Sequence, residues 1–361
     1  MIIGIILHPF GEAKPGGLAR TILEWTRGLL TIDHSNQYIV FVKEKPQIAP
    51  DLPGKNWRLE VLGGGAFWLN RLKNKEQADV YLFQTPVLPF GYTPKNSIII
   101  AQDFPYFYLR PHNIKEAVRN ALVKHYHKFS LQRATKIIAV SNSTKSDLMK
   151  FFYVPENKIN IIHMGFKNVC MAREIPIDLP EKFFLFVGVI KERKNVLRVV
   201  EAFRDFKKSN PNLTHKLVFA GRPSGWYAEK VQNFIANNNL AHQTIFLDHI
   251  NDGQLAYVYK RTEALLFPSV IESFGFPVLE AMACGTPVIT ANIGGPAEIG
   301  VNVALLVNPY QLEEIAQAMD KIATDANFRA RLIVAGQARA NEFSWSKTAA
   351  KTLELIKALK S

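Results

Sequence analysis

The chain has 361 residues, of which 48% are hydrophobic and 21% are charged. This composition suffices for two ordinary folded domains and excludes an intrinsically disordered protein. Its apolar runs have the length of strands, and none reaches the roughly 18 residues that a membrane-spanning helix needs. The net charge of +13 favours an anionic partner, for which nucleic acid, an anionic membrane and a nucleotide-linked substrate all qualify. A basic solvated surface without a specific partner is the simpler alternative.

The N-terminus and the cysteines bear on the compartment. Residues 1–8 lack a basic lead and a small-residue cleavage site, so we expect a first buried strand there and not a signal peptide. The two cysteines, Cys170 and Cys284, are far apart in sequence and have no metal-binding spacing. A reducing cytoplasm fits best, with peripheral contact at the inner face of a membrane as a further expectation.

In the first half of the chain, short apolar segments alternate with longer segments of helical period. Strands are predicted at 1–8, 37–43, 80–84, 97–101 and 136–141. Helices are predicted at 17–31, 114–133 and 143–152, the last capped by Ser141 or Ser143. The first helix carries Leu18, Ile22, Trp25 and Leu29 on one face. This alternation predicts a doubly wound α/β domain with a mostly parallel sheet.

Segment 166–182 has no clear period and contains Pro176 and Pro180, so we place a linker there. The pattern then restarts, with strands predicted at 182–188, 215–221, 244–247, 264–267 and 287–291. Helices are predicted at 195–209, 226–238, 252–260, 277–284 and 310–325. A final helix at 344–360 packs on the second unit or crosses back onto the first. We therefore divide the chain into a domain at 1–170, a domain at 171–343 and a C-terminal helix at 344–361.

Two glutamates, Glu272 and Glu280, flank a turn that leads into a predicted helix. Gly275 and Pro277 break the backbone between them, so Glu272 is expected on the loop and Glu280 about one turn inside the helix. The amides from Phe274 to Phe276 suit an anionic or hydroxyl-rich ligand, and both phenylalanines are expected to be exposed. An ordinary helix N-terminus would also explain Glu280, because acidic residues complement the helix dipole.

Two other loops follow predicted strands, where open α/β sheets bind ligands. Gly16 and Gly17 precede the first helix and would let the backbone approach a phosphate, although a simple tight turn is equally consistent. Gly188, Arg193 and Lys194 follow the first strand of the second domain. Two cations beside a helix start could clamp a diphosphate, and a solvated charged loop is the alternative. A further glycine-rich turn is expected at 292–298.

Four motifs occur in order: Arg193-Lys194-Asn195, the run from Glu272 to Met282, Cys284-Gly285-Thr286-Pro287-Val288 and Gly294-Gly295-Pro296-Ala297-Glu298. Together they closely resemble the retaining glycosyltransferases of family 4. The resemblance implies a GT-B fold, with two Rossmann-like domains and an interdomain cleft. It also implies metal-independent transfer of a hexosyl group from a GDP- or UDP-linked sugar to a glycan or lipid-linked acceptor, as in cell-surface polysaccharide synthesis. No cofactor and no nucleic-acid partner are implied.

The resemblance assigns roles to individual residues. Glu280 would bind the donor ribose, Glu272 the donor sugar, and the backbone of Ser273, Phe274, Gly275 and Phe276 the sugar and its phosphate. Arg193 and Lys194 would neutralise the leaving diphosphate, near Gly188, while Gly16 and Gly17 would approach it from the first, acceptor-binding domain. Stabilising the charge of the departing diphosphate is the main electrostatic task of such a site.

One position departs from the family. Many relatives carry His-Asp after a central strand of the first domain, and the matching residues here are Gln102 and Asp103. Glutamine can hydrogen-bond a sugar hydroxyl but cannot take a proton at neutral pH. The loss of the histidine is tolerable in a retaining reaction in which the leaving phosphate accepts the proton of the acceptor hydroxyl. Asp103 is either a site residue or a strand-end cap.

A basic and aromatic stretch runs from Tyr106 to Arg133. A solvated helix face is the common explanation for such a pattern. The alternatives are an acceptor site and a surface that docks on an anionic membrane. The other functions that fit the chain are a different activity on the same fold, such as a nucleotide-sugar epimerase, and an inactive basic scaffold that binds membrane or nucleic acid.

Overall fold

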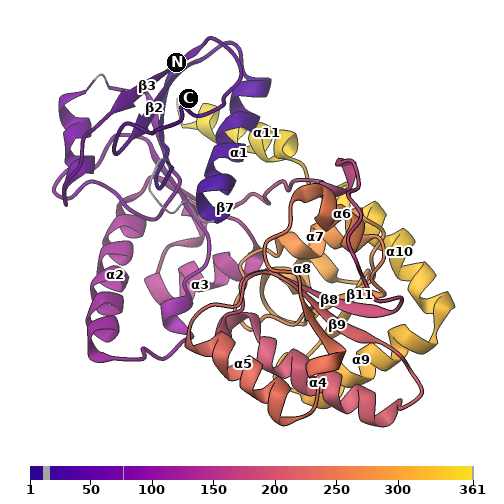
Figure 1. Ribbon diagram of the computed structural model, residues 1–361. Helices are drawn as coiled ribbons and strands as arrows, with labels where there is room; N and C mark the ends of the chain where they lie inside the picture. The colour runs from indigo at the N-terminus through magenta and orange to yellow at the C-terminus, as the bar shows by residue number, and fades with distance from the viewer. Residues whose placement is uncertain (11–16, 76, 360–361) are drawn as a thin grey trace. The chain divides into compact units, whose positions relative to one another are not determined.

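The computed structural model describes residues 1–10, 17–75 and 77–359. Its contacts divide the chain into two compact units (Figure 1). Unit 1 comprises Met1–Gly165 and Phe343–Ser361, and unit 2 comprises Phe166–Glu342. The contacts therefore place the first boundary five residues before the one drawn from the sequence, and they group the C-terminal segment with unit 1.

Unit 1 contains a seven-stranded sheet whose paired strands all run parallel. The strands are β1 (Ile2–Ile6), β2 (Gln37–Val42), β3 (Trp57–Val61), β4 (Val80–Phe83), β5 (Ser97–Ala101), β6 (Lys136–Ala139) and β7 (Ile159–Ile161). They lie in the order β3-β2-β1-β4-β5-β6-β7. The order changes direction between β1 and β4, and ligands bind at the carboxyl ends of strands beside such a switch point.

The helices of unit 1 are α1 (Gly17–Ile32), α2 (Ile114–Arg133), α3 (Asn142–Phe152) and α11 (Trp345–Ala358), with 3-10 turns η1 (Trp68–Asn74), η2 (Pro105–Phe107) and η3 (Glu156–Lys158). Ser141 caps α3. The predicted apolar face of α1 is confirmed for Ile22, Trp25 and Leu29, which are buried, while Leu18 is half-buried. α11 packs against α1 (Figure 1), where Trp25 Nε1 donates to Thr352 Oγ1 at 3.1 Å.

Unit 2 repeats this architecture with six parallel strands. They are β8 (Phe183–Val187), β9 (Lys216–Ala220), β10 (Thr244–Phe246), β11 (Ala264–Phe267), β12 (Val288–Ala291) and β13 (Leu305–Val307). The order β10-β9-β8-β11-β12-β13 places its switch point between β8 and β11. The central strands are buried on both faces, which explains why they are continuous apolar runs in the sequence.

The helices of unit 2 are α4 (Val196–Ser209), α5 (Trp226–Asn237), α6 (Asp252–Tyr259), α7 (Phe276–Ala283), α8 (Gly294–Gly300), α9 (Leu312–Thr324) and α10 (Ala326–Ala340), with 3-10 turns η4 (Val169–Met171), η5 (Glu192–Lys194) and η6 (Ala241–Gln243). The expected turn at 292–298 is wrong, because helix α8 occupies most of it. Glycine disfavours helix, but Gly294 and Gly295 let α8 lie directly against the backbone of Glu272 and Ser273.

The cysteines form a disulfide that the sequence analysis did not predict. Cys170, in η4, pairs with Cys284, which ends α7, and their Cα atoms are 5.4 Å apart. Disulfides persist mainly in oxidising compartments, so the pairing removes the support that the cysteines lent to a reducing cytoplasm. None of the helices in the described part of the chain is both long enough and apolar enough to cross a bilayer.

Candidate active site

In unit 2, the predicted residues gather where β8 and β11 end. The loop after β8 leads through η5 into α4 and carries Arg193 and Lys194, while the loop after β11 carries Glu272. The backbone joins these loops, because Val270 N donates to Arg193 O at 2.9 Å. Residues that are about 80 positions apart in sequence therefore form one cluster at the switch point of the sheet.

The cluster is an ion-pair network. Lys194 Nζ forms a short hydrogen bond with Glu272 Oε2, and Arg193 Nη1 lies 3.4 Å from the same oxygen. Lys194 also lies over the Phe267 ring, 4.3 Å from its centroid. The Lys194 and Glu272 side chains are only 12% and 13% exposed, so their charges interact in a poorly solvated environment. These contacts bring two cations together with one carboxylate, and paired cations suit an anionic ligand.

Asn195 fixes the backbone that presents the two cations. It adopts a left-handed conformation with φ 60°, which asparagine tolerates better than most residues. Its side chain is buried, and Nδ2 donates to Pro268 O at 3.1 Å and to Pro309 O at 2.6 Å. This residue therefore joins the start of α4 to the segment after β11, which limits how far the cations can move.

Glu280 lies inside α7, as the sequence analysis predicts. Its Oε2 accepts a hydrogen bond from the Tyr259 hydroxyl at 3.1 Å. Tyr259 is fully buried, and burial raises its pKa well above the usual value, so the phenol stays protonated and continues to donate. The bond orients the Glu280 carboxylate through one oxygen.

The loop between the two glutamates is tightly packed. Gly275 has φ 113°, a conformation that L side chains rarely adopt, and it begins α7. The expectation that both phenylalanines are exposed is wrong for Phe274, which is 1% exposed, and Phe276 is half-buried. Phe274 packs edge-to-face against Phe276. Phe274 therefore anchors the loop in the core. Ser273, the residue before it, is half-buried.

Gly188 follows β8 directly, and its amide donates to Ala220 O at 2.9 Å. Its φ is 127°, and a Cβ built there meets no atom within 4 Å in the described part of the chain. The backbone at this point is therefore accessible beside the cation cluster, on the edge of the sheet where parallel α/β sheets bind ligands.

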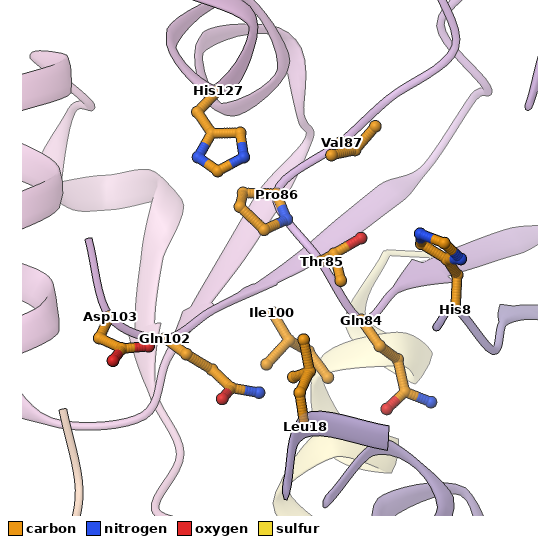
Figure 2. Close-up of a pocket in the computed structure, with 10 residues that line it drawn as sticks. All are labelled: His8, Leu18, Gln84, Thr85, Pro86, Val87, Ile100, Gln102, Asp103 and His127. Carbon is orange, nitrogen blue, oxygen red and sulfur yellow. The ribbon is translucent and has the colours of Figure 1, made fainter. Parts of the chain in front are cut away.

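Unit 1 has a pocket of about 340 Å³ at its own switch point (Figure 2). His8 follows β1, Gln84 and the next three residues follow β4, and Gln102 and Asp103 follow β5. Helices complete the wall with Leu18 from α1 and His127 from α2. The predicted Gln102 and Asp103 therefore share one pocket with residues that the sequence analysis did not select.

Two amide side chains of this pocket carry unsatisfied atoms. Gln84 is 1% exposed, and its Nε2 donates to Thr26 Oγ1 at 2.7 Å. Its Oε1 and the Nε2 of Gln102 are buried without a hydrogen-bond partner among the described residues. Buried polar groups are nearly always paired with protein, water or ligand. A hydroxyl group could donate to Gln84 and accept from Gln102. Figure 2 shows the two side chains on either side of Ile100 and Leu18.

His127 adds an uncharged imidazole to the pocket. Its Nδ1 lies 2.6 Å from the Tyr106 hydroxyl, and burial lowers the pKa of His127 to about 4. The ring is therefore neutral at pH 7, with one nitrogen paired to Tyr106. In the sequence, His127 belongs to the stretch from Tyr106 to Arg133, which a solvated face, an acceptor site or a membrane surface would each explain. The side of α2 that faces the pocket cannot be predicted from a charge pattern. Gln84 was detectable as the last residue of a predicted strand.

Two further predictions concern the start of α1. Gly17 is its first residue, and a Cβ there meets no described atom within 4 Å. Gly16 lies outside the described residues. No three His, Cys, Asp or Glu side chains come together as a metal site in the portion of the chain that the structure describes.

Known families match both halves of the chain. Residues 15–167 match the description "Glycosyltransferase Family 4", and residues 171–339 match "Glycosyl transferases group 1". An uncharacterized glycosyltransferase of Methanocaldococcus jannaschii is 29% identical over 63% of this chain and 61% of its own length. O-antigen chain mannosyltransferase B of Escherichia coli is 23% identical over 77% of this chain and 74% of its own. The match thus spans about three fifths of the first relative and three quarters of the second.

Solved structures share the fold. Sucrose-phosphate synthase from Thermosynechococcus elongatus superimposes with a TM-score of 0.78 at 20% identity, over 99% of this chain and 98% of that one. Anabaena HepE in complex with UDP and glucose gives a TM-score of 0.74 at 17% identity, over 99% of each chain. With two parallel-sheet α/β units and family matches over both, the chain belongs to the GT-B glycosyltransferases, as a member of family 4 and group 1.

Proposed function

We propose that the protein transfers a hexosyl group from a nucleotide-diphosphate sugar to a hydroxyl of a glycan or lipid-linked acceptor, with retention of anomeric configuration and without a metal. The observation that carries the proposal is the cluster of Arg193, Lys194 and Glu272 at the switch point of unit 2. Family membership supports transfer, the Escherichia coli relative supports a hexose and a polysaccharide product, and the UDP and glucose in the HepE complex support the donor class.

Unit 2 is proposed to bind the donor. Arg193 and Lys194 would contact the diphosphate, and Gly188 and the backbone from Ser273 to Phe276 would lie along the diphosphate and sugar. Glu280, oriented by Tyr259, would accept hydrogen bonds from the ribose hydroxyls. Glu272 already bonds both cations. Its role would therefore be twofold: it holds the cations together before the donor arrives, and it contacts the donor sugar afterwards.

The proposed reaction breaks the bond between the anomeric carbon and the diphosphate oxygen. The bonding electron pair leaves with the diphosphate, whose additional charge Arg193 and Lys194 stabilise. The acceptor hydroxyl attacks on the face that the diphosphate leaves, and its proton passes to an oxygen of the departing phosphate. This route needs no protein base, which is consistent with glutamine at position 102.

Unit 1 is proposed to bind the acceptor. Its pocket offers amides, an aspartate and a neutral imidazole, and this mixture suits hydroxyl groups. Gln84 and Gln102 would bind the reacting sugar through their unsatisfied atoms, with Asp103 and His127 completing the contacts. Gly16 and Gly17 remain proposed neighbours of the donor phosphate.

The first test is transfer of labelled hexose from UDP- and GDP-sugars to glycan acceptors, with product anomers assigned by NMR. Glu280→Gln should weaken donor binding, and Arg193→Ala should chiefly lower turnover. The control is Glu229→Gln, which changes an exposed glutamate of α5. Unchanged hydrolysis and transfer in both site variants would show that the site is elsewhere. An epimerised nucleotide sugar in place of a transferred hexose would favour a nucleotide-sugar epimerase.

A further inference from the structure

Helix α2 exposes a row of large apolar side chains. Ile114, Val118 and Leu122 are 81%, 56% and 67% exposed. Spacing of four residues places them on one side of the helix, and the row is about 12 Å long at the helical rise per residue. Single exposed apolar residues are common, but a contiguous row marks an interaction surface.

Among the described residues, the buried side chains of α2 lie at its C-terminal end. Ser130 and Leu131 are buried, and the Tyr126 hydroxyl donates to Leu88 O at 2.5 Å. The first turns are largely exposed, and Figure 1 shows α2 as a long rod at the edge of the unit. The apolar row therefore contributes little to the core, and another explanation for its composition is required.

Cations border this row on both sides. From Arg110 to Arg133 the sequence has six Lys or Arg residues and one carboxylate, Glu116. At 100° per residue, Lys115 and Arg119 flank one side of the row, and Lys128 flanks the other. Protein–protein interfaces are depleted in lysine, whereas interfacial membrane helices combine an apolar face with Lys and Arg.

We propose that Ile114, Val118 and Leu122, with their flanking cations, form a surface that docks on a bilayer containing anionic lipids. The apolar row would enter the acyl boundary, and the cations would contact the headgroups. Val118 and His127 are nine residues apart, or two and a half turns, so they lie on opposite sides of α2. A docked bilayer would thus lie about 10 Å, one helix diameter, from the pocket lining. That distance suits a lipid-linked acceptor, and only this last point rests on the proposed function.

The test is cosedimentation with vesicles of phosphatidylcholine alone or mixed with phosphatidylglycerol, and it needs neither donor nor acceptor. We expect binding to the anionic vesicles at low salt, weakened by high salt. Lys115→Gln with Arg119→Gln should weaken binding about thirtyfold, since each cation near an anionic surface contributes about fivefold. Val118→Asp with Leu122→Asp should abolish binding. The matched control is Val334→Asp, because Val334 is a 70% exposed valine on α10.

Three results would overturn the proposal. If wild-type protein stays in the supernatant with anionic vesicles at low salt, the membrane-docking surface does not exist. Equal binding by the Val118→Asp, Leu122→Asp double variant and by Val334→Asp would locate the contact elsewhere. The wild type could instead self-associate in light scattering and bind no vesicles. If the double variant then fails to self-associate, the occupant of the surface is a second copy of the chain. Circular dichroism of each variant verifies that the fold is intact.

Discussion

Gly295→Ala tests whether the loop between the two glutamates holds the donor. A Cβ at Gly295 would lie 2.2 Å from Ser273 O and 2.5 Å from Phe274 Cα. Ordinary contact begins near 3.4 Å, so α8 or the loop must shift by about 1.2 Å, the difference between 2.2 and 3.4 Å. Because the obstructing atoms are backbone, a change of rotamer cannot relieve the clash. Misplacement of bound groups by about 1 Å can lower a reaction rate on the order of a hundredfold.

The matched control is Gly300→Ala, on the same helix. The three atoms nearest to its Cβ would be side-chain atoms of Ala304, Leu306 and Thr290, at 3.1 to 3.3 Å, so a shift of a few tenths of an ångström suffices. Affinity for UDP and GDP is measured by calorimetry, and folding by thermal unfolding. We expect Gly295→Ala to weaken binding of the preferred nucleotide and to lower the rate of transfer about a hundredfold, whereas Gly300→Ala should bind the nucleotide like the wild type. If Gly295→Ala folds and binds the nucleotide normally, the loop does not hold the donor.

Three further predictions concern the pocket and the disulfide. The free energy of unfolding should fall by about 3 kcal/mol between pH 6.5 and pH 4 on account of His127, because its pKa of about 4 lets only the unfolded state bind a proton in that window. Urea titrations should show that His127→Gln removes this slope and that His125→Gln, on the exposed face, retains it. Cys284→Ser should lower the free energy of unfolding by about 4 to 5 kcal/mol, since the disulfide closes a loop with a separation of 114 residues. In the same urea titrations, adding Cys170→Ser should not lower the free energy of unfolding further. In kinetic assays, Gln84→Leu should raise the acceptor KM about tenfold, as expected for loss of one or two hydrogen bonds, and leave donor hydrolysis unchanged; an unaltered KM would remove Gln84 from the acceptor site.

Most of the fold could be predicted from the sequence because its signals are local. Central strands are continuous apolar runs, and α1 carries its buried face at helical spacing. The missed strands β3, β7 and β13 are short or half-exposed, so their period is weak. Helix α8 was missed because its glycines serve contact with a distant loop, and that contact is a tertiary property.

The candidate site likewise has residues that the sequence could predict and contacts that it could not. Arg193, Lys194 and Glu272 follow strands, and they could be selected by position and charge. That Glu272 pairs with both cations could not be predicted, since about 80 residues separate them. Burial of Phe274 likewise depends on how α8 packs against its loop. The pocket role of His127 depends on which side of α2 faces the sheet, and the local sequence around it reads as basic surface.

The central claim is that the cations at the switch point of unit 2 bind the donor's diphosphate. The most direct measurement compares the calorimetric affinities of nucleoside monophosphate and diphosphate for wild-type protein, Arg193→Gln and the control Arg204→Gln, whose arginine pairs with Asp205 on α4. Hydrogen bonds to charged groups contribute about 1.5 to 3 kcal/mol. The preference for diphosphate over monophosphate should therefore fall at least about tenfold in Arg193→Gln and persist in Arg204→Gln. An unchanged preference in Arg193→Gln would contradict the claim.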